Sequence, residues 1–291
     1  MRHSPLTTSG PGHRRPDKDP GPDTHTGRAL PLVAVAHGSS DPRAAASVDT
    51  LLSLVRARAA AAGYPGLDVR AAYLGHAAPT LAQALGAVDG AAVVLPLLLT
   101  PAYHSKTDIP KVLHEARRAR PRLGISYGRP LGPHPLLRRA LERRLAEAAD
   151  GEPLSASTAA QSASTTVIVL AAAGSSDPAA NAVITDQAER WQAERGWRAV
   201  LPAYASAASP TPPEAVAAAR RSGARRVLVA SYLLCPGVFA DQVRSDCLAA
   251  GASAVSPVLG AAPEIADIVL GRYAESLTSG AVPLTDGAAA V

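Results

Sequence analysis

The sequence is poor in aromatic residues and cysteine and has no long apolar run, and each of these shortages excludes a class of protein. Aromatics make up 3% of the 291 residues, so few side chains could stack on nucleic-acid bases, and no nucleic-acid-binding motif accompanies the net charge of +5. The two cysteines form no CxxC pair and no disulfide framework, which fits a reducing compartment. No apolar run reaches the roughly 18–20 residues of a membrane span. We therefore expect a cytoplasmic protein with neither a nucleic-acid nor a membrane partner.

Three segments lack the apolar periodicity of folded elements. Residues 1–29 are rich in Pro, Gly, His, Arg and Asp and are predicted to form a disordered tail. The pair Arg14-Arg15 is not expected to be an export signal, because Pro16 and Asp17 follow where an apolar segment should begin. Residues 150–165 are small and polar, which predicts a linker, and residues 277–291 are predicted to be a frayed tail. These boundaries leave two lobes, 30–149 and 166–276.

Short apolar runs alternate with helical patterns in both lobes. We predict strands near 31–36, 68–74, 91–98, 123–127, 166–172, 198–204, 225–231 and 253–256. We predict helices near 42–62, 79–87, 107–119, 135–149, 178–195, 212–222, 240–250 and 263–276. This alternation is typical of an α/β fold, so we expect two flavodoxin-like lobes, each a parallel sheet flanked by helices. In the strand order 2-1-3-4, the first and third strands flank the switch point where ligands bind.

The second lobe repeats the first, which indicates an internal duplication. Four anchors recur in the same order at offsets of 128 to 136 residues: GSSDP at 38–42 and 174–178, Tyr73 and Tyr204 with the Pro-Thr pairs that follow them, LLTP at 98–101 and LLCP at 233–236, and Leu-Gly at 131–132 and 259–260. Features kept in both copies are expected to serve the fold. Features present in one copy are candidates for function.

The GSSDP motif is kept in both lobes and follows a strand. Ser or Asp can cap the helix that begins there, and Pro suits the first helical position. The exposed N–H groups of such a helix start can also hold a phosphate or carboxylate. Gly38, Ser39 and Ser40 are therefore also candidate substrate-binding residues.

The histidines of the first lobe are replaced in the second. His37 corresponds to Ala173, and His104 corresponds to Phe239. His76 corresponds to Ala207, and His134 corresponds to Ala262. His37 and His104 follow the first and third predicted strands, so they should face one cleft. Two imidazoles can bind a borderline divalent metal, but they are too few for a closed structural site, which suits a metal that is handed on.

These motifs resemble the sirohydrochlorin chelatase family, the class II chelatases of sirohaem and cobalamin biosynthesis, in its long two-lobed form. The matching pieces are VAVAHGSSDPRA at 33–44, LPLLLTPAYHSKTDIPK at 95–111 and GRPLGPHPLL at 128–137. The resemblance implies a lyase-type enzyme with a tetrapyrrole cleft between its lobes, and metal-binding histidines at His37 and His104. It also implies an acidic residue in the loop after the second strand, where this chain has Gly75 next to His76.

The resemblance implies that a divalent metal, Fe²⁺ or Co²⁺, is inserted into sirohydrochlorin with loss of two pyrrole protons. We expect Fe²⁺, because no His-rich metal-storage tract is present. His37 and His104 would act as metal ligand and proton acceptor, in an order the sequence leaves open. Candidate substrate-binding residues are Gly38, Ser39, Ser40, Tyr103, Lys106, His76 and His134. The metal is a substrate, and no organic cofactor is expected.

Two other functions stay open from the sequence alone. One is a phosphate- or nucleotide-binding α/β protein that uses GSSDP, although the chain has no GxGxxG and no Walker lysine. The other is a non-catalytic carrier of metal or tetrapyrrole, which would bind its ligand without turnover. Two fused lobes could replace a homodimer of single lobes, so we expect a two-lobed monomer, with a homo-oligomer as the alternative.

Overall fold

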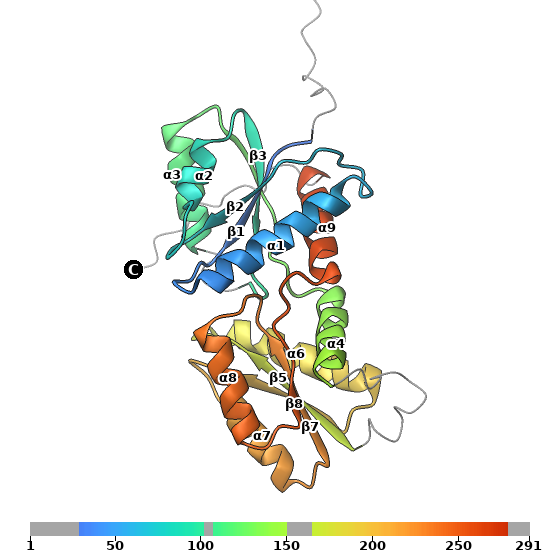
Figure 1. The fold of residues 1–291 in the computed structure, drawn as a ribbon. Coiled ribbons are helices and arrows are strands. Elements are labelled where there is room, and N and C mark those ends of the chain that lie inside the picture. Colours follow the sequence, from blue (N-terminus) through green and yellow to red (C-terminus); the bar gives the residue numbers. More distant parts are fainter. Residues whose placement is uncertain (1–28, 102–106, 150–164, 279–291) are drawn as a thin grey trace, which may run out of the picture.

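The computed structural model describes residues 29–101, 107–149 and 165–278, which form two α/β lobes (Figure 1). The first lobe has a parallel sheet of order β2-β1-β3-β4, and the second a parallel sheet of order β6-β5-β7-β8. The strands are β1 (Leu32–Ala36), β2 (Val69–Tyr73), β3 (Ala91–Pro96), β4 (Gly124–Tyr127), β5 (Thr166–Ala172), β6 (Ala199–Tyr204), β7 (Arg226–Tyr232) and β8 (Ala254–Val255). The predicted fold class and strand order are confirmed.

The helices connect these strands in both lobes. They are α1 (Pro42–Ala59), α2 (Leu81–Gly86), α3 (Ile109–Ala119), α4 (Pro135–Ala148), α6 (Pro178–Arg195), α7 (Pro212–Arg221), α8 (Val238–Ala249) and α9 (Pro263–Thr278). Every predicted strand and helix is present, with ends shifted by at most three residues. Within the described ranges, no helix is both long and apolar enough to cross a membrane.

The helix starts repeat between the lobes because the capping residues repeat. Asp41 caps α1 by accepting a hydrogen bond from the Arg43 N–H at 3.0 Å, and Asp177 caps α6 from the Ala179 N–H at 2.9 Å. A proline follows each aspartate at the first helical position. Proline has no N–H, but an N–H at this position would have no partner within the helix. The Asp-Pro end of the GSSDP motif therefore has a structural role in each lobe.

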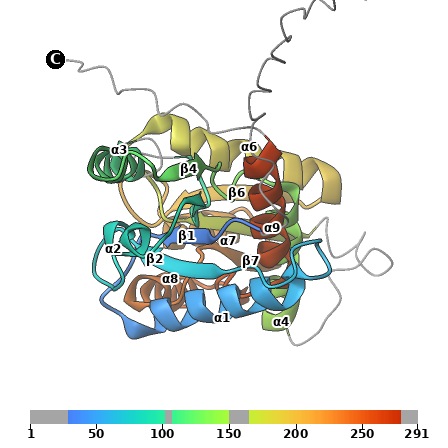
Figure 2. The ribbon, with the colours of Figure 1, turned by 90° about the horizontal axis from the view of Figure 1, so that it is seen from above.

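The last helix of each half of the sequence packs on the sheet of the other half. Helix α4 precedes the linker but lies against β7 and β8 of the second sheet. Helix α9 ends the described chain but lies against β3 and β4 of the first sheet, beside α1 (Figures 1 and 2). The chain thus crosses between the lobes after β4 and again after β8. The elements on either side of the linker, α4 and β5, both belong to the second lobe.

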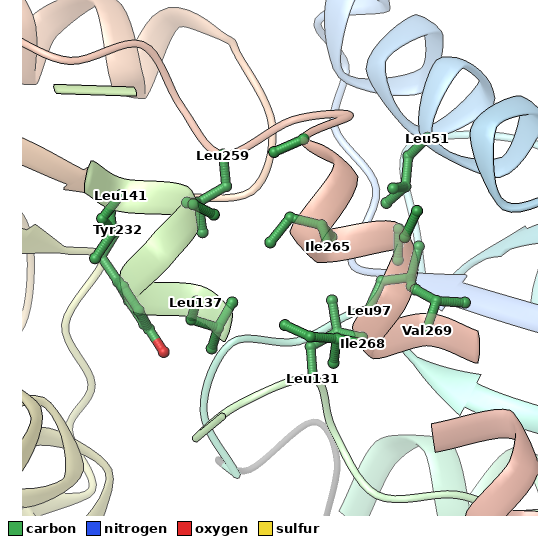
Figure 3. Packing of buried hydrophobic residues seen from close by; sticks show 14 of the residues in the cluster. Leu51, Leu97, Leu131, Leu137, Leu141, Tyr232, Leu259, Ile265, Ile268 and Val269 are labelled. Carbon is green, nitrogen blue, oxygen red and sulfur yellow. The ribbon is translucent and has the colours of Figure 1, made fainter. Parts of the chain in front are cut away.

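One continuous core joins the lobes through these two helices. Leu137 and Leu141 of α4 belong to the same buried cluster as Ile265 and Ile268 of α9 (Figure 3). The cluster covers one face of each sheet, whereas the opposite faces are closed separately by α2 and α3 in the first lobe and by α7 and α8 in the second. Separating the lobes would expose this shared core to water, so the lobes hold each other in a fixed arrangement.

Ion pairs at the edges of the shared core also hold α4 and α9 in the lobes that they join. Arg58 of α1 pairs with Asp267 of α9 at 2.7 Å, and Arg195 of α6 pairs with Glu142 of α4 at 2.5 Å. Glu142 also accepts a hydrogen bond from the buried Trp191 indole at 3.0 Å. Each exchanged helix is therefore fixed to the first long helix of the lobe that it joins.

Because α4 and α9 are exchanged, the two halves of the sequence do not coincide with the two lobes in space. The sequence divides the chain into 30–149 and 166–276, but α4 belongs spatially to the second sheet and α9 to the first. A sequence pattern cannot reveal this, because a buried helix face looks the same whichever sheet covers it. Most of the predicted tails and linker lies outside the described residues, and α9 extends to Thr278, into the segment expected to fray.

We expect Ile268→Ala to lower the free energy of unfolding by about 2–5 kcal/mol, the usual range for an isoleucine in a packed core. Ile268 is 1% exposed and lies in the core that joins the lobes. The matched control is Leu277→Ala on the same helix, where the side chain is 37% exposed and the change should stay within about 0.5 kcal/mol. Urea unfolding measures both, and equal losses in the two variants would contradict the shared core.

Candidate functional site

A cleft of about 1070 Å³ lies between the lobes, at the carboxyl ends of both sheets. From the first lobe it is lined by the segment after β1 and the segment after β3, and from the second by the equivalent segments after β5 and β7. Nearly half of the lining residues are Ala, Val, Leu or Ile. In parallel α/β sheets this edge carries the ligand site, and the volume is at the upper end of the roughly 300–1,000 Å³ of small-molecule sites.

His37 lies at the cleft directly after β1. Its Nδ1–H donates a hydrogen bond to the Gly38 carbonyl at 3.1 Å. In the neutral ring this bond puts the proton on Nδ1, so Nε2 carries the lone pair that can bind a metal or accept a proton. At the equivalent position of the second lobe, Ala173 lines the same cleft and offers no such group.

Gly38 is required by a close approach of two loops. Its φ is 89°, and a Cβ there would lie 1.8 Å from the Gly75 carbonyl oxygen. Gly174 repeats this geometry with a φ of 85° and a Cβ position 2.0 Å from the Ser206 carbonyl oxygen. The glycine of the motif therefore serves the packing of the loop after each first strand, and this packing sets the position of His37 in the first lobe.

The loop after β5 in the second lobe is held by two side-chain hydrogen bonds that the residues of the first lobe cannot form. Asn181 accepts from the Ser175 N–H at 3.0 Å and donates to the Ser175 carbonyl at 2.7 Å. Ala45 stands at the equivalent place in the first lobe and has no group that could form these bonds. Ser39, Ser40, Ser175 and Asn181 all line the cleft, so the two walls present different polar groups on the same backbone.

A charged cluster joins the lobes at the edge of the cleft. The Arg43 guanidinium lies 2.6 Å from the Asp41 carboxylate and 2.7 Å from the Asp241 carboxylate of α8. The hydrogen bond from Arg43 lowers the pKa of Asp41, with a smaller contribution from the Val238 N–H of the second lobe. Asp41 is therefore ionised near neutral pH and held between the lobes, which makes it a poor candidate for a proton acceptor.

His134 and His76 lie elsewhere. Neither is among the cleft-lining residues in the described part of the chain. The Nδ1 of His134 accepts from the Leu136 N–H at 3.1 Å and so caps α4. His76 is exposed with a φ of 60°, and Ala207 repeats this φ at 58°, so the bend belongs to the fold and not to the histidine.

Tyr103, His104 and Lys106 lie outside the described residues. The segment that leads to them is described as far as Pro101, and it starts beside β1, the strand that His37 follows. The Leu97 N–H donates to the Val35 carbonyl of β1 at 2.7 Å, and Leu97 to Thr100 line the cleft.

The comparison with known proteins agrees with the fold. The family model CbiX matches residues 31–148 and 167–276, which is most of the chain and covers both halves of the duplication. The chain belongs to the CbiX family. The family resemblance predicted from the sequence is thereby confirmed.

The chain is similar to two sirohydrochlorin chelatases of known name. It is 28% identical over 178 residues to the sirohydrochlorin ferrochelatase of Priestia megaterium, covering 60% of this chain and 63% of that protein. It is 30% identical over 155 residues to the sirohydrochlorin cobaltochelatase of the same organism, covering 53% and 48%. The alignments thus span less than two thirds of either relative.

A solved structure shows the same fold. The structure of SirB from Bacillus subtilis with Fe³⁺ superposes with a TM-score of 0.69, covering 86% of this chain and 96% of that one. The sequences are 22% identical, so this likeness concerns the fold alone.

The sequence interpretation missed the contacts between the lobes. Arg43 and Asp241 pair across the cleft, and Tyr232 donates from the second lobe to the Leu99 carbonyl at 3.0 Å. All three differ from their counterparts in the duplication, which are Ala179, Lys106 and Leu97. The comparison of the two halves that singled out the histidines could therefore have indicated these residues as well.

We expect His134→Ala to lower the free energy of unfolding by about 1 kcal/mol near pH 7.5, because α4 loses its cap. Burial, and then Arg272, lowers the pKa of His134 below its ordinary value. The neutral cap therefore stabilises the protein above about pH 6.5, and this contribution is lost as the pH falls below that value.

His134→Asn is the matched variant, because asparagine can cap the helix but does not titrate. Denaturant unfolding between pH 7.5 and 5.5 should show a smaller loss of stability for the asparagine variant than for the wild type. The same loss in both proteins would show that the titration of His134 does not couple to folding.

Proposed function

We propose that this chain is a sirohydrochlorin chelatase that inserts a divalent metal into the tetrapyrrole within the cleft between its lobes. The observation that carries the proposal is the position of His37, which lines the cleft at the switch point of the first sheet. Membership in the CbiX family and the names of the two relatives support the same reaction.

The metal would be bound by His37 and His104 as a substrate and passed to the macrocycle. Replacing two pyrrole N–H protons by a dication leaves the charge of the macrocycle core unchanged, so the two protons must be accepted by other groups. The Nε2 of His37 can bind the metal or take one of these protons, because its Nδ1–H is engaged with the Gly38 carbonyl. His104 would take the other role, and water at the opening of the cleft would accept the second proton.

The walls of the cleft suit the face of a large ring. Among the described residues that line it, none is a lysine or arginine. The apolar walls would contact the ring, and the carboxylates of the substrate would point toward the openings and water, where their hydration is retained.

Fe²⁺ is the metal we propose first, with Co²⁺ as the alternative. The two relatives carry names for both metals at similar identity. Imidazole nitrogens bind both ions, so the metal must be assigned by assay.

We expect His37→Ala and His104→Ala each to reduce the initial rate of metal insertion about 10²–10⁴-fold while the protein stays folded. The fold should tolerate these changes, because Ala173 and Phe239 occupy the equivalent positions of the second lobe. His114→Ala on the outer helix α3 is the control and should keep the wild-type rate. The assay follows sirohydrochlorin absorbance with Fe²⁺, Co²⁺ or Ni²⁺, and circular dichroism checks folding.

Two results of this assay would reject the proposal. Wild-type rates in both folded histidine variants would remove the assigned site. Product that stops at one equivalent of protein would indicate a carrier and not an enzyme.

We expect Phe239→Ala to weaken tetrapyrrole binding about tenfold and to leave metal binding unchanged. Phe239 lines the cleft from the second lobe and is 44% exposed, so its ring is available to a ligand. The matched control is Leu248→Ala, which is also on α8 and 42% exposed but is not among the described lining residues. Fluorescence titration with sirohydrochlorin measures both, and equal affinities in the two variants would contradict this role.

A further inference from the structure

Tyr232 links the second lobe to the first lobe through one hydrogen bond. It ends β7, lines the cleft and is 4% exposed, and its hydroxyl donates to the Leu99 carbonyl at 3.0 Å. Figure 3 shows the side chain beside α4, the helix that the first half of the chain contributes to the second lobe. Burial raises the pKa of Tyr232, so the hydroxyl remains a donor at any pH near neutrality.

The segment that receives this bond is held from three directions. The Leu97 N–H donates to β1, and the Gly132 N–H donates to the Leu98 carbonyl at 3.3 Å. A Cβ at Gly132 would lie 1.8 Å from the Leu99 carbonyl oxygen, so that loop packs directly against the Leu99 peptide. Tyr232 supplies the third contact, and it alone of the three comes from the second lobe.

The second lobe holds its equivalent segment in a different way. There the carbonyls of Leu233 and Leu234 accept from the N–H groups of Leu259 and Gly260, at 2.9 and 2.8 Å. Both donors follow β8, the last strand of the same sheet. In the first lobe the Gly132 N–H bonds to Leu98 instead, and the Leu99 carbonyl receives the tyrosine from across the cleft.

We propose that Tyr232 is a positioning residue for metal insertion: through the Leu99 carbonyl, the second lobe fixes the segment that leads to His104. This inference rests on the proposed function, in which His104 is a metal ligand. His104 follows Leu99 by five residues in the sequence, so the anchor lies close to the ligand along the chain. The two lobes would then depend on each other for the metal site as well as for the core.

The test is Tyr232→Phe, which removes one hydroxyl and leaves the ring in the wall of the cleft. We expect its affinity for Co²⁺, measured by calorimetry without tetrapyrrole, to fall about tenfold, because groups that orient a metal ligand typically contribute this much. The insertion rate should fall with it, whereas the KM for sirohydrochlorin should change less than twofold.

Tyr273→Phe is the matched control. Tyr273 is also buried, and its hydroxyl also donates to a backbone carbonyl, that of Leu30 at 2.7 Å, but it is not among the described cleft-lining residues. It should lose thermal stability as Tyr232→Phe does but keep the wild-type affinity for Co²⁺. Equal affinities in the two tyrosine variants would overturn the positioning role.

His104→Ala separates this outcome from a failure of the proposed function. If His104→Ala loses Co²⁺ and Tyr232→Phe does not, the positioning role is wrong and the metal site stands. If His104→Ala binds Co²⁺ as the wild type does, the assigned metal site is wrong, and the positioning role falls with it.

A second measurement uses the wild-type protein and does not depend on a variant that folds. Addition of Co²⁺ should slow amide hydrogen exchange in residues 97–100 and also in residues 230–234 of the second lobe. Residues 271–274 around Tyr273 should be unaffected. Protection confined to the first lobe would show that metal binding does not reach Tyr232.

Discussion

The packing of α4 and α9 against each other, each on the sheet of the opposite half, is the constraint on which the rest of the structure depends. Leu137 and Leu141 of α4 and Ile265 and Ile268 of α9 are buried in one cluster, which the two crossings bring together. Two lobes joined by a linker alone would be free to move apart, since a flexible linker sets a distance but not an orientation. The exchange instead fixes the two sheets with their carboxyl ends facing each other, and the cleft is the space left between those ends.

This arrangement explains how a duplicated fold can carry one asymmetric site. The capping aspartates, the close-approach glycines and the strand order are the same in both lobes, so the backbone of the two cleft walls is closely similar. The side chains on that backbone differ: His37 faces the cleft where the other wall has Ala173, and Asn181 braces a loop where the first lobe has Ala45. The first lobe thereby presents an imidazole where the second presents a methyl group, and the second presents an amide where the first presents a methyl group.

Contacts across the cleft then relate the two walls to each other. The Arg43 guanidinium joins carboxylates from both lobes at the edge, and the Tyr232 hydroxyl reaches the Leu99 peptide within the cleft. The exposed ion pair is expected to contribute little to stability, because water screens it. The buried tyrosine bond is different, because loss of the hydroxyl would leave the Leu99 carbonyl without this donor in an apolar wall.

The sequence by itself determined the α/β class, every described strand and helix, the strand order and the duplication. These follow from local patterns: apolar runs, Asp-Pro helix starts and repeated anchors. It also indicated His37, because an imidazole kept in one copy and lost in the other can be read without coordinates. The sequence did not distinguish the role of His37 from the roles of His134 and His76. A histidine that caps a helix and one that lines a cleft can show the same pattern, present in one copy and absent from the other. Only the tertiary structure decided the exchange of α4 and α9, the cleft that results, and the contacts of Arg43 and Tyr232. The physical reason is that an apolar helix face specifies burial but not the sheet that buries it, and a hydrogen bond between residues 133 positions apart leaves no local pattern.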